Sequence, residues 1–519
     1  MARDISAARE GLHSVTRGTL ILLLGTVAFV GASFIARVLL VRYLSSIEFS
    51  EFYIALTLAG LLTALGQLGL PNAVARSIPF AHSPEERRAF IRTGFFVVVP
   101  LALGAGAVLF GLSIPISDRF HAPLLGMALQ FFAVAVVCAI VTSQVASVFQ
   151  GFEDVWPNTL FVQILNPVLF IAFVVAFVAV GPRNVPFGYS GALFAYALSA
   201  VVALGGILVY YRARIGRYLT PGPVAPGAAR RLMLFAAPLF VVGIFSYLAG
   251  SVDTLLLGYF HNSQTGAYGA ALSLSRLTLL GLGALAYILL PVIARFARDN
   301  DPENARLIYA TATKWMVVTS LPVWLVFVFF PGPSLTFVYK SSYAQSTLPL
   351  QILVTGAFAS TVIGPASAAQ VSFGQTRLLL YNNIAGAAFD VILGLLLVPT
   401  YGEVGAAVAW AGAATLIPTL SVAELAWTHG LHPFLRNYLV GLLGTSIPIA
   451  VIFALVPGSP PLWLLPGLVL GVAATFLGVV IATRSFDRGD RLLLEAVERM
   501  IGRPLPGARW IARHFPARD

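Results

Sequence analysis

Charged residues are scarce in this chain. Only 10% of its 519 residues are Asp, Glu, Lys or Arg, and 58% are hydrophobic. Because a soluble globular chain carries roughly 25% charged residues, this composition excludes a large soluble protein built from several domains. A membrane-spanning helix needs about 20 apolar residues. The sequence therefore predicts an all-α, polytopic membrane protein with about 14 transmembrane helices.

Cysteine and histidine are scarce as well. The one cysteine, Cys138, lies in an apolar stretch and the seven histidines are scattered, which excludes a disulfide framework and Cys/His zinc spacing. Neither a G-x-S-x-G motif nor a P-loop occurs. The first apolar run is too long for a cleavable signal peptide and lacks the small-residue cleavage site. We therefore expect a protein that is not an enzyme and has no cofactor.

Lysine is nearly absent, yet the net charge is +11. This charge does not point to nucleic acid, because basic residues are retained on the cytoplasmic loops of membrane proteins. With the N-terminus inside, most of the 32 basic residues fall on cytoplasmic segments. The outer side then receives Arg42, Arg119, Arg183 and Lys340. The pattern predicts an even number of spans in the cytoplasmic membrane, with both termini in the cytoplasm.

Long apolar stretches follow one another along the chain, and we number them as spans 1 to 14. They cover residues 18–42, 51–75, 93–116, 124–149, 157–180, 187–211, 232–259, 265–294, 308–330, 345–371, 378–398, 404–427, 434–456 and 462–483.

An internal repeat relates the first six spans to the next six, because residues 37–58 align without gaps with residues 253–274. Transporters often contain such duplicated units, and residues at matching positions would then meet across a central cavity.

The predicted organisation follows from this repeat. An N-terminal lobe at 1–211 and a C-terminal lobe at 232–427 form two pseudo-symmetric six-helix halves. A Pro- and Gly-rich cytoplasmic linker at 212–231 joins them. Two extra helices at 428–484 and a cytoplasmic amphipathic tail at 485–519 complete the chain.

Three basic residues lie within predicted spans: Arg37 in span 1, Arg276 in span 8 and Lys314 in span 9. A charge at mid-bilayer costs about 3 kcal/mol, so such residues usually face the bundle interior or a watery cavity. Together they would attract an anionic phosphate or pyrophosphate head, which arginine binds bidentately. They are our candidate substrate-binding residues. The alternative is that each pairs locally with a carboxylate or reaches the membrane interface.

Carboxylates also occur within spans. Asp253 lies in span 7 and Asp390 in span 11, where Asn383 shares a helix face with it. Two carboxylates and an amide oxygen could hold Na⁺, or the acids could carry H⁺. This set is the candidate ion-coupling site. A structural ion pair, for example between Asp253 and Arg37, is the alternative.

Two glutamates, Glu48 and Glu51, lie in the first predicted outer loop. Membrane glycosyltransferases that use polyprenyl donors carry acidic residues there for a metal, but they usually also have long outer loops or an outer domain. This chain has neither, so we expect both glutamates to be solvated. A membrane glycosyltransferase stays the alternative from a different functional class.

Several segments resemble one known family. The segment FIARVLLVRYLSSIEFSEFYIALTLAGLLTALGQLGLPNAVAR at 34–76 is similar to the opening of polysaccharide-repeat-unit flippases, within the multidrug/oligosaccharidyl-lipid/polysaccharide exporter superfamily. The segments at 253–274, 287–296 and 401–410 fit the same family. The run A-R-V-L-L-V-R-Y around Arg37 matches span 1 of the lipid II flippases only in part.

This resemblance implies two six-helix lobes, alternating access and an ion site between spans 7 and 11. We therefore predict a flippase that moves a polyprenyl-(pyro)phosphate-linked oligosaccharide from the inner to the outer leaflet, with Na⁺ or H⁺ as candidate coupling ion. Expected partners are the glycan lipid, membrane lipids and glycan assembly enzymes, and a monomer would suffice. The alternative functions for a membrane protein of this kind are those of a multidrug or metabolite cation antiporter, a lipid II flippase and a lipid scramblase.

Overall fold

The computed structural model describes residues 2–179, 188–215, 227–299 and 301–434, with the single residues 467, 470, 471, 474, 475, 478, 490 and 498. Within these residues the chain is helical and contains no strand. The predicted spans 13 and 14 and the predicted tail lie outside the described residues, apart from those single positions. The chain divides into two compact units, one of Ile21–Gly269 and one of Met1–Leu20 with Ala270–Asp519. The predicted lobe boundaries at 211 and 232 stay a prediction.

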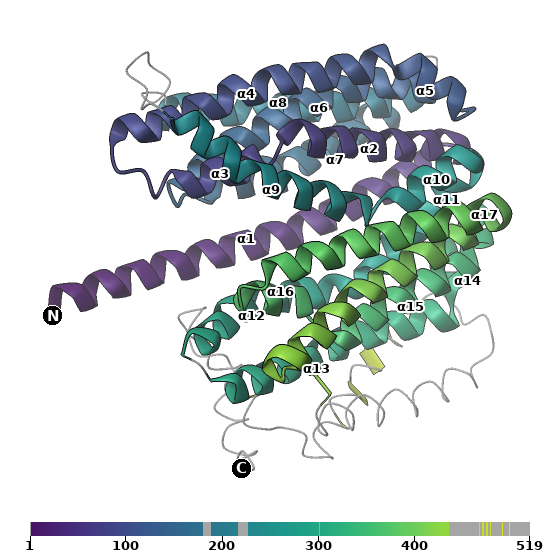
Figure 1. Ribbon diagram of the computed structural model, residues 1–519. Helices are drawn as coiled ribbons and strands as arrows, with labels where there is room; N and C mark the ends of the chain where they lie inside the picture. Colours follow the sequence, from purple (N-terminus) through teal and green to yellow (C-terminus); the bar gives the residue numbers. More distant parts are fainter. Residues whose placement is uncertain are drawn as a thin grey trace. The chain divides into compact units, whose positions relative to one another are not determined.

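The unit Ile21–Gly269 is a helical bundle in which α6 packs against α2, α3, α4 and α8 (Figure 1). Its elements are the part of α1 (Ala2–Tyr43) that follows Leu20, α2 (Ser46–Gln67), α3 (Leu70–Ser77), α4 (Pro84–Gly111), α5 (Ser113–Arg119), α6 (Leu125–Gly151), the π-helix η1 (Asn158–Leu165), α7 (Asn166–Val174), the π-helix η2 (Val175–Ala179), α8 (Gly188–Ile215), α9 (Ala228–Leu248), α10 (Val252–Phe260) and the first part of α11 (Asn262–Ser275). These helices are apolar on most sides, as expected for segments surrounded by lipid and by each other.

Aromatic rings form the centre of this bundle. Phe132 of α6 stacks on Tyr196 of α8 with ring centroids 4.4 Å apart, and Phe52 of α2 meets Phe132 edge to face at 5.3 Å. Phe170 of α7 closes the cluster against Tyr196 at 5.3 Å. Such aromatic pairs add about 0.5–1.5 kcal/mol each beyond their buried area. The cluster fixes α2, the helix on which the candidate site is built.

The second unit contains the rest of α11 and the helices that follow it. They are the 3₁₀ turn η4 (Arg276–Leu279), α12 (Leu280–Arg298), α13 (Pro302–Phe329), α14 (Pro331–Val338), the 3₁₀ turn η5 (Ser341–Ser346), α15 (Thr347–Ile363), α16 (Ala366–Ser372) and α17 (Thr376–His429). Its core joins α12, α13, α16 and α17 through fully buried residues that include Ile293, Ile308, Met316 and Leu425.

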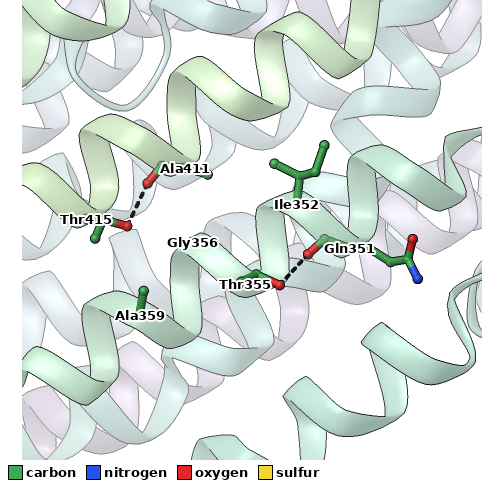
Figure 2. Close-up of a pocket in the computed structure, with 7 residues that line it drawn as sticks. All are labelled: Gln351, Ile352, Thr355, Gly356, Ala359, Ala411 and Thr415. Carbon is green, nitrogen blue, oxygen red and sulfur yellow. Dashed lines mark hydrogen bonds between the residues drawn. The ribbon is translucent and has the colours of Figure 1, made fainter. Parts of the chain in front are cut away.

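An apolar groove of about 440 Å³ runs between α15 and α17 of this unit (Figure 2). Two hydroxyls line it, but Thr355 donates to the carbonyl of Gln351 at 2.7 Å and Thr415 to that of Ala411 at 2.8 Å. Each threonine therefore turns its hydroxyl back onto its own helix. No charged side chain is among the residues that line the groove, so it is not suited to a phosphate head.

Ten helices among the described residues are long and apolar enough to cross a membrane. The last of them, α17, contains the predicted spans 11 and 12 and is broken at Gly402, whose φ of 53° and ψ of −128° are not helical. The predicted span 8 is built from α11, η4 and α12 rather than from one continuous helix. The protein is thus an all-α, multi-pass membrane protein, and the number 14 stays a prediction.

The break in α17 generates the first testable prediction. Gly402→Ala should destabilise the protein by about 1–3 kcal/mol, because an alanine is strained at this positive φ. The midpoint of thermal unfolding in detergent measures the loss. Gly205→Ala in α8 is the matched control, since a Cβ at this helical glycine meets no atom within 4 Å. Equal midpoints for the two variants would contradict the break at Gly402.

Candidate functional site

One face of α2 packs closely against α9, α10 and α11, and we call this contact the α2 seam. Ser50 accepts a hydrogen bond from the Gly266 N–H at 2.8 Å, and Tyr247 of α9 donates to the carbonyl of Thr57 at 2.6 Å. A Cβ at Gly269 would lie 2.6 Å from the Tyr53 ring. The backbones therefore approach closely only because the α11 positions are glycines.

The seam brings together residues at matching positions of the sequence repeat. Ser50 and Gly266 are 216 positions apart, which is the spacing at which residues 37–58 align with residues 253–274. Tyr53 and Gly269, which are also in contact, match in the same alignment. The first repeat and the start of the second repeat therefore meet along α2 and α11.

Glu48 and Glu51 have structural roles at the start of this seam. Ser45 and Glu48 form a capping box, in which the Ser45 N–H donates to Glu48 Oε2 at 2.7 Å and the Glu48 N–H to Ser45 Oγ at 3.3 Å. Glu51 is fully buried and accepts from Asn262 Nδ2 at 3.5 Å. The prediction of two solvated glutamates was wrong for Glu51, because the seam covers its side chain. Among the described residues, no cluster of three or more His, Cys, Asp or Glu side chains could hold a metal ion.

The two predicted substrate arginines remain partly accessible. Arg37 is half-buried in α1, and Arg276 is half-buried at the first position of η4. Each of the two predicted ion-coupling carboxylates is instead completely buried, Asp253 in α10 and Asp390 in α17. Asp253 accepts hydrogen bonds from Tyr268 Oη and, at 3.5 Å, from Thr254 Oγ1. Arg37 and Asp253 belong to the unit Ile21–Gly269, and Arg276 and Asp390 to the other unit.

The third predicted substrate residue, Lys314, forms a buried ion pair. Its Nζ lies 2.6 Å from Asp490 Oδ2, and the two side chains are only 3% and 2% exposed. Trp315 Nε1 donates to the other oxygen of Asp490 at 2.7 Å. The carboxylate thus neutralises the Lys314 charge, which is the alternative that the sequence left open. The role of Lys314 in substrate binding stays a prediction.

The neighbour of the predicted ion ligand Asn383 belongs to a polar cluster that the sequence did not reveal. Asn383 is half-buried, whereas Asn382 is buried and donates to Glu424 Oε2 at 2.8 Å and to Ser421 Oγ at 3.2 Å. Gln370 of α16 donates to the same Glu424 oxygen at 2.5 Å. The cluster ties α16 to both halves of α17. The signal in the sequence was the pair of amides Gln370 and Asn382 inside apolar stretches, which are rare without a polar partner.

The Lys314–Asp490 pair makes a sharp prediction. Asp490→Ala should lower the free energy of unfolding by roughly 3–5 kcal/mol, because it leaves a buried ammonium without a counter-charge. Lys314→Met combined with Asp490→Leu should recover most of this loss, because it removes both charges. Thermal unfolding in detergent measures both. Asp299→Ala is the control. Because Asp299 is 46% exposed in its ion pairs, this substitution should lower the free energy of unfolding by less than about 1 kcal/mol. Equal losses for Asp299→Ala and Asp490→Ala would contradict the buried pair.

Known proteins share this architecture. The chain is 20% identical over 399 residues to the "Probable low-salt glycan biosynthesis flippase Agl15" of Haloferax volcanii, a match that covers 76% of this chain and 80% of the relative. The structure is similar to lipid II flippase MurJ in an inward closed conformation, with a TM-score of 0.72 and 14% identity over 89% of this chain and 99% of MurJ. An inward-facing multidrug resistance MATE family transporter gives a TM-score of 0.62 and 15% identity over 80% of this chain and 97% of the transporter.

Family models agree with these likenesses. The model described as polysaccharide biosynthesis protein matches residues 15–297, and the MatE model matches residues 238–396. The first match covers more than half of the chain. The helical architecture, the close seam between repeats and these matches lead to one conclusion: the chain belongs to the polysaccharide biosynthesis protein family, in the multidrug/oligosaccharidyl-lipid/polysaccharide (MOP) exporter superfamily of flippases and transporters.

Proposed function

We propose that this MOP-superfamily protein is a flippase for a polyprenyl-(pyro)phosphate-linked oligosaccharide. It moves the anionic head and its sugars from the inner to the outer leaflet of the cytoplasmic membrane, while the lipid tail stays in the bilayer. Arg37 and Arg276 bind the phosphates. The relative Agl15 is named as a glycan biosynthesis flippase, which supports this substrate class.

One observation carries the proposal. Within the apolar helices the arginines Arg37 and Arg276 keep accessible surface, whereas the carboxylates Asp253 and Asp390 have none. A guanidinium that water reaches can exchange that water for phosphate oxygens, with two parallel hydrogen bonds. A fully buried carboxylate offers nothing to a large organic cation. The accessible charge therefore favours an anionic substrate over the cations that a multidrug antiporter carries.

The α2 seam supports alternating access as the mechanism. In the predicted topology Ser50 and Gly266 lie near the outer face, so the seam closes that side between the two repeats. Opening it requires the loss of the hydrogen bonds at Ser50 and Thr57 and of the close contact at Gly266 and Gly269. A substrate or ion can drive this opening only by binding the two states with different affinity. Asp253 and Asp390 are our candidates for Na⁺ or H⁺ binding in that step.

Translocation in proteoliposomes tests the proposed substrate. A fluorescent polyprenyl-pyrophosphate oligosaccharide is placed in the membrane, and its arrival in the opposite leaflet is followed by quenching. Arg276→Ala should slow translocation about tenfold or more, because it removes charge-assisted hydrogen bonds to the phosphates. Arg276→Lys should retain part of the rate, since it keeps the charge and loses the bidentate geometry.

Arg298→Ala is the matched control. Arg298 is an exposed arginine of the same unit that pairs with Asp299 at 3.2 Å, so its loss changes the net charge equally without touching the helix interior. An unchanged rate in Arg276→Ala, with normal insertion, would refute the role of this arginine. Failure of the unsubstituted protein to move the lipid would refute the substrate class, and cationic dyes would then test the antiporter.

Closure of the seam can be followed separately with a thiol probe. Ser50→Cys in a Cys138→Ala background should react slowly with a membrane-impermeant maleimide added outside, because the seam covers position 50. Adding Gly269→Ala should raise the labelling rate and lower transport by about tenfold, since its Cβ overlaps the Tyr53 ring. Tyr53→Ala should reverse both effects by making room for that Cβ.

Gly283→Ala provides the control for this experiment. Gly283 lies in α12, in the same predicted span as Gly269, and a Cβ there meets no atom within 4 Å. It should leave labelling and transport unchanged. If Gly269→Ala and Gly283→Ala label alike, the seam is not the closure between the repeats.

A further inference from the structure

A pocket of about 300 Å³ opens where α3, α4 and α9 come together in the unit Ile21–Gly269. Its charged walls are the last turn of α3, with Arg76, and the first turns of α4 and α9, with Glu86 and Arg231. Phe80, Phe90 and Phe235 supply the apolar part of the lining. None of the residues that line the pocket belongs to the α2 seam, and neither Arg37 nor Arg276 is among them.

Glu86 is already satisfied by the protein. One oxygen lies 2.8 Å from Arg231 Nη1, and the other accepts the backbone N–H of His82 at 2.9 Å. Glu86 therefore acts as a fixed anchor for Arg231, whose side chain stays 57% exposed.

Arg76 is the cation of the pocket that no carboxylate of the described residues neutralises. Its guanidinium carbon lies 4.1 Å from the centroid of the Phe235 ring, so the ring covers one face and leaves the N–H edge open. In the described part of the chain Arg76 makes no ion pair. Arg87, Arg88 and Arg230 flank the pocket in sequence, and the acidic residues of these turns are Glu85 and Glu86. The pocket thus carries a net positive charge that the protein itself does not neutralise.

The pocket also lies at a boundary between polar and apolar sequence. After Arg92, α4 continues as TGFFVVVPLALGAGAVLFG, and after Arg231, α9 continues as LMLFAAPLFVVGIF. The charged turns therefore lie where both helices enter the membrane, at the depth of lipid headgroups. Phe80 is 71% exposed beside them, as aromatic residues at this interface often are.

We propose that this pocket binds the phosphate ester of an anionic membrane lipid. Arg76 and Arg231 hold the phosphate oxygens, Glu86 fixes Arg231 in place, and the phenylalanines contact the start of the lipid chains. Two lipids present this chemistry, an anionic phospholipid of the inner leaflet and a polyprenyl phosphate. A lipid bound here also bridges α3 and α4 of the first repeat to α9 of the second. The proposal does not depend on the glycan-flippase assignment.

Lipid titration of the full-length protein in neutral detergent tests this site. Native mass spectrometry counts bound phosphatidylglycerol, polyprenyl phosphate or phosphatidylcholine at increasing lipid concentration. Arg76→Gln should weaken the tightest site for at least one of the two anionic lipids about tenfold, and Arg76→Lys should weaken it less. Arg298→Gln removes the same charge elsewhere and should leave that site unchanged.

Each outcome decides a part of the proposal. The tighter of the two anionic lipids identifies the natural source of the phosphate, and either one supports the site. Equal affinities in Arg76→Gln and Arg298→Gln, with unchanged unfolding midpoints, would overturn it. Inorganic phosphate that displaces phosphatidylglycerol at equal concentration would show a site for a soluble anion and would overturn the lipid assignment. Phosphatidylcholine that binds as tightly as both anionic lipids would have the same effect.

Discussion

A polar or charged group inside a lipid bilayer must find its partner within the protein, and this constraint organises the structure. Lys314 meets Asp490 from 176 residues away, and Asp253 meets Tyr268. Hydroxyls without a distant partner turn back to their own helix, as Thr57 does to the carbonyl of Tyr53 at 2.8 Å. Because water cannot satisfy these groups in the hydrocarbon region, each such contact restricts how the helices can pack.

The same constraint explains the small residues in the α2 seam. Lipid tails are as apolar as leucine, so helices in a membrane associate through close packing and hydrogen bonds rather than through the hydrophobic effect. Where the matching positions of the sequence repeat meet in the seam, two large side chains cannot both fit. Serine and tyrosine on α2 are accordingly opposed by Gly266 and Gly269 on α11. A contact of this kind is specific in register and can still be opened at modest cost.

Composition and hydropathy were sufficient to predict the fold class and the positions of most of the spans. The gap between spans 11 and 12 coincides with the break at Gly402, because Pro399 and Gly402 interrupt the apolar pattern there. The burial of Glu51 could not be predicted, because it depends on Asn262, which lies 211 residues away. Which of the neighbouring amides Asn382 and Asn383 is buried depends on the rotation of α17 about its axis. Two adjacent asparagines in the sequence do not reveal that rotation.

The three basic residues within the predicted spans look alike in the sequence but differ in their surroundings in the structure. Arg37, Arg276 and Lys314 all lie within apolar stretches, and no local pattern distinguishes them. Lys314 is buried against Asp490, so binding a phosphate there would first require breaking an ion pair and exposing a carboxylate to an anion. Arg37 and Arg276 are only half-buried, and a ligand can replace water on the part of each side chain that stays accessible. A binding site gains affinity only from interactions that exceed the cost of desolvation. This is the reason why we propose Arg37 and Arg276, rather than Lys314, as the residues that bind the phosphates of the substrate.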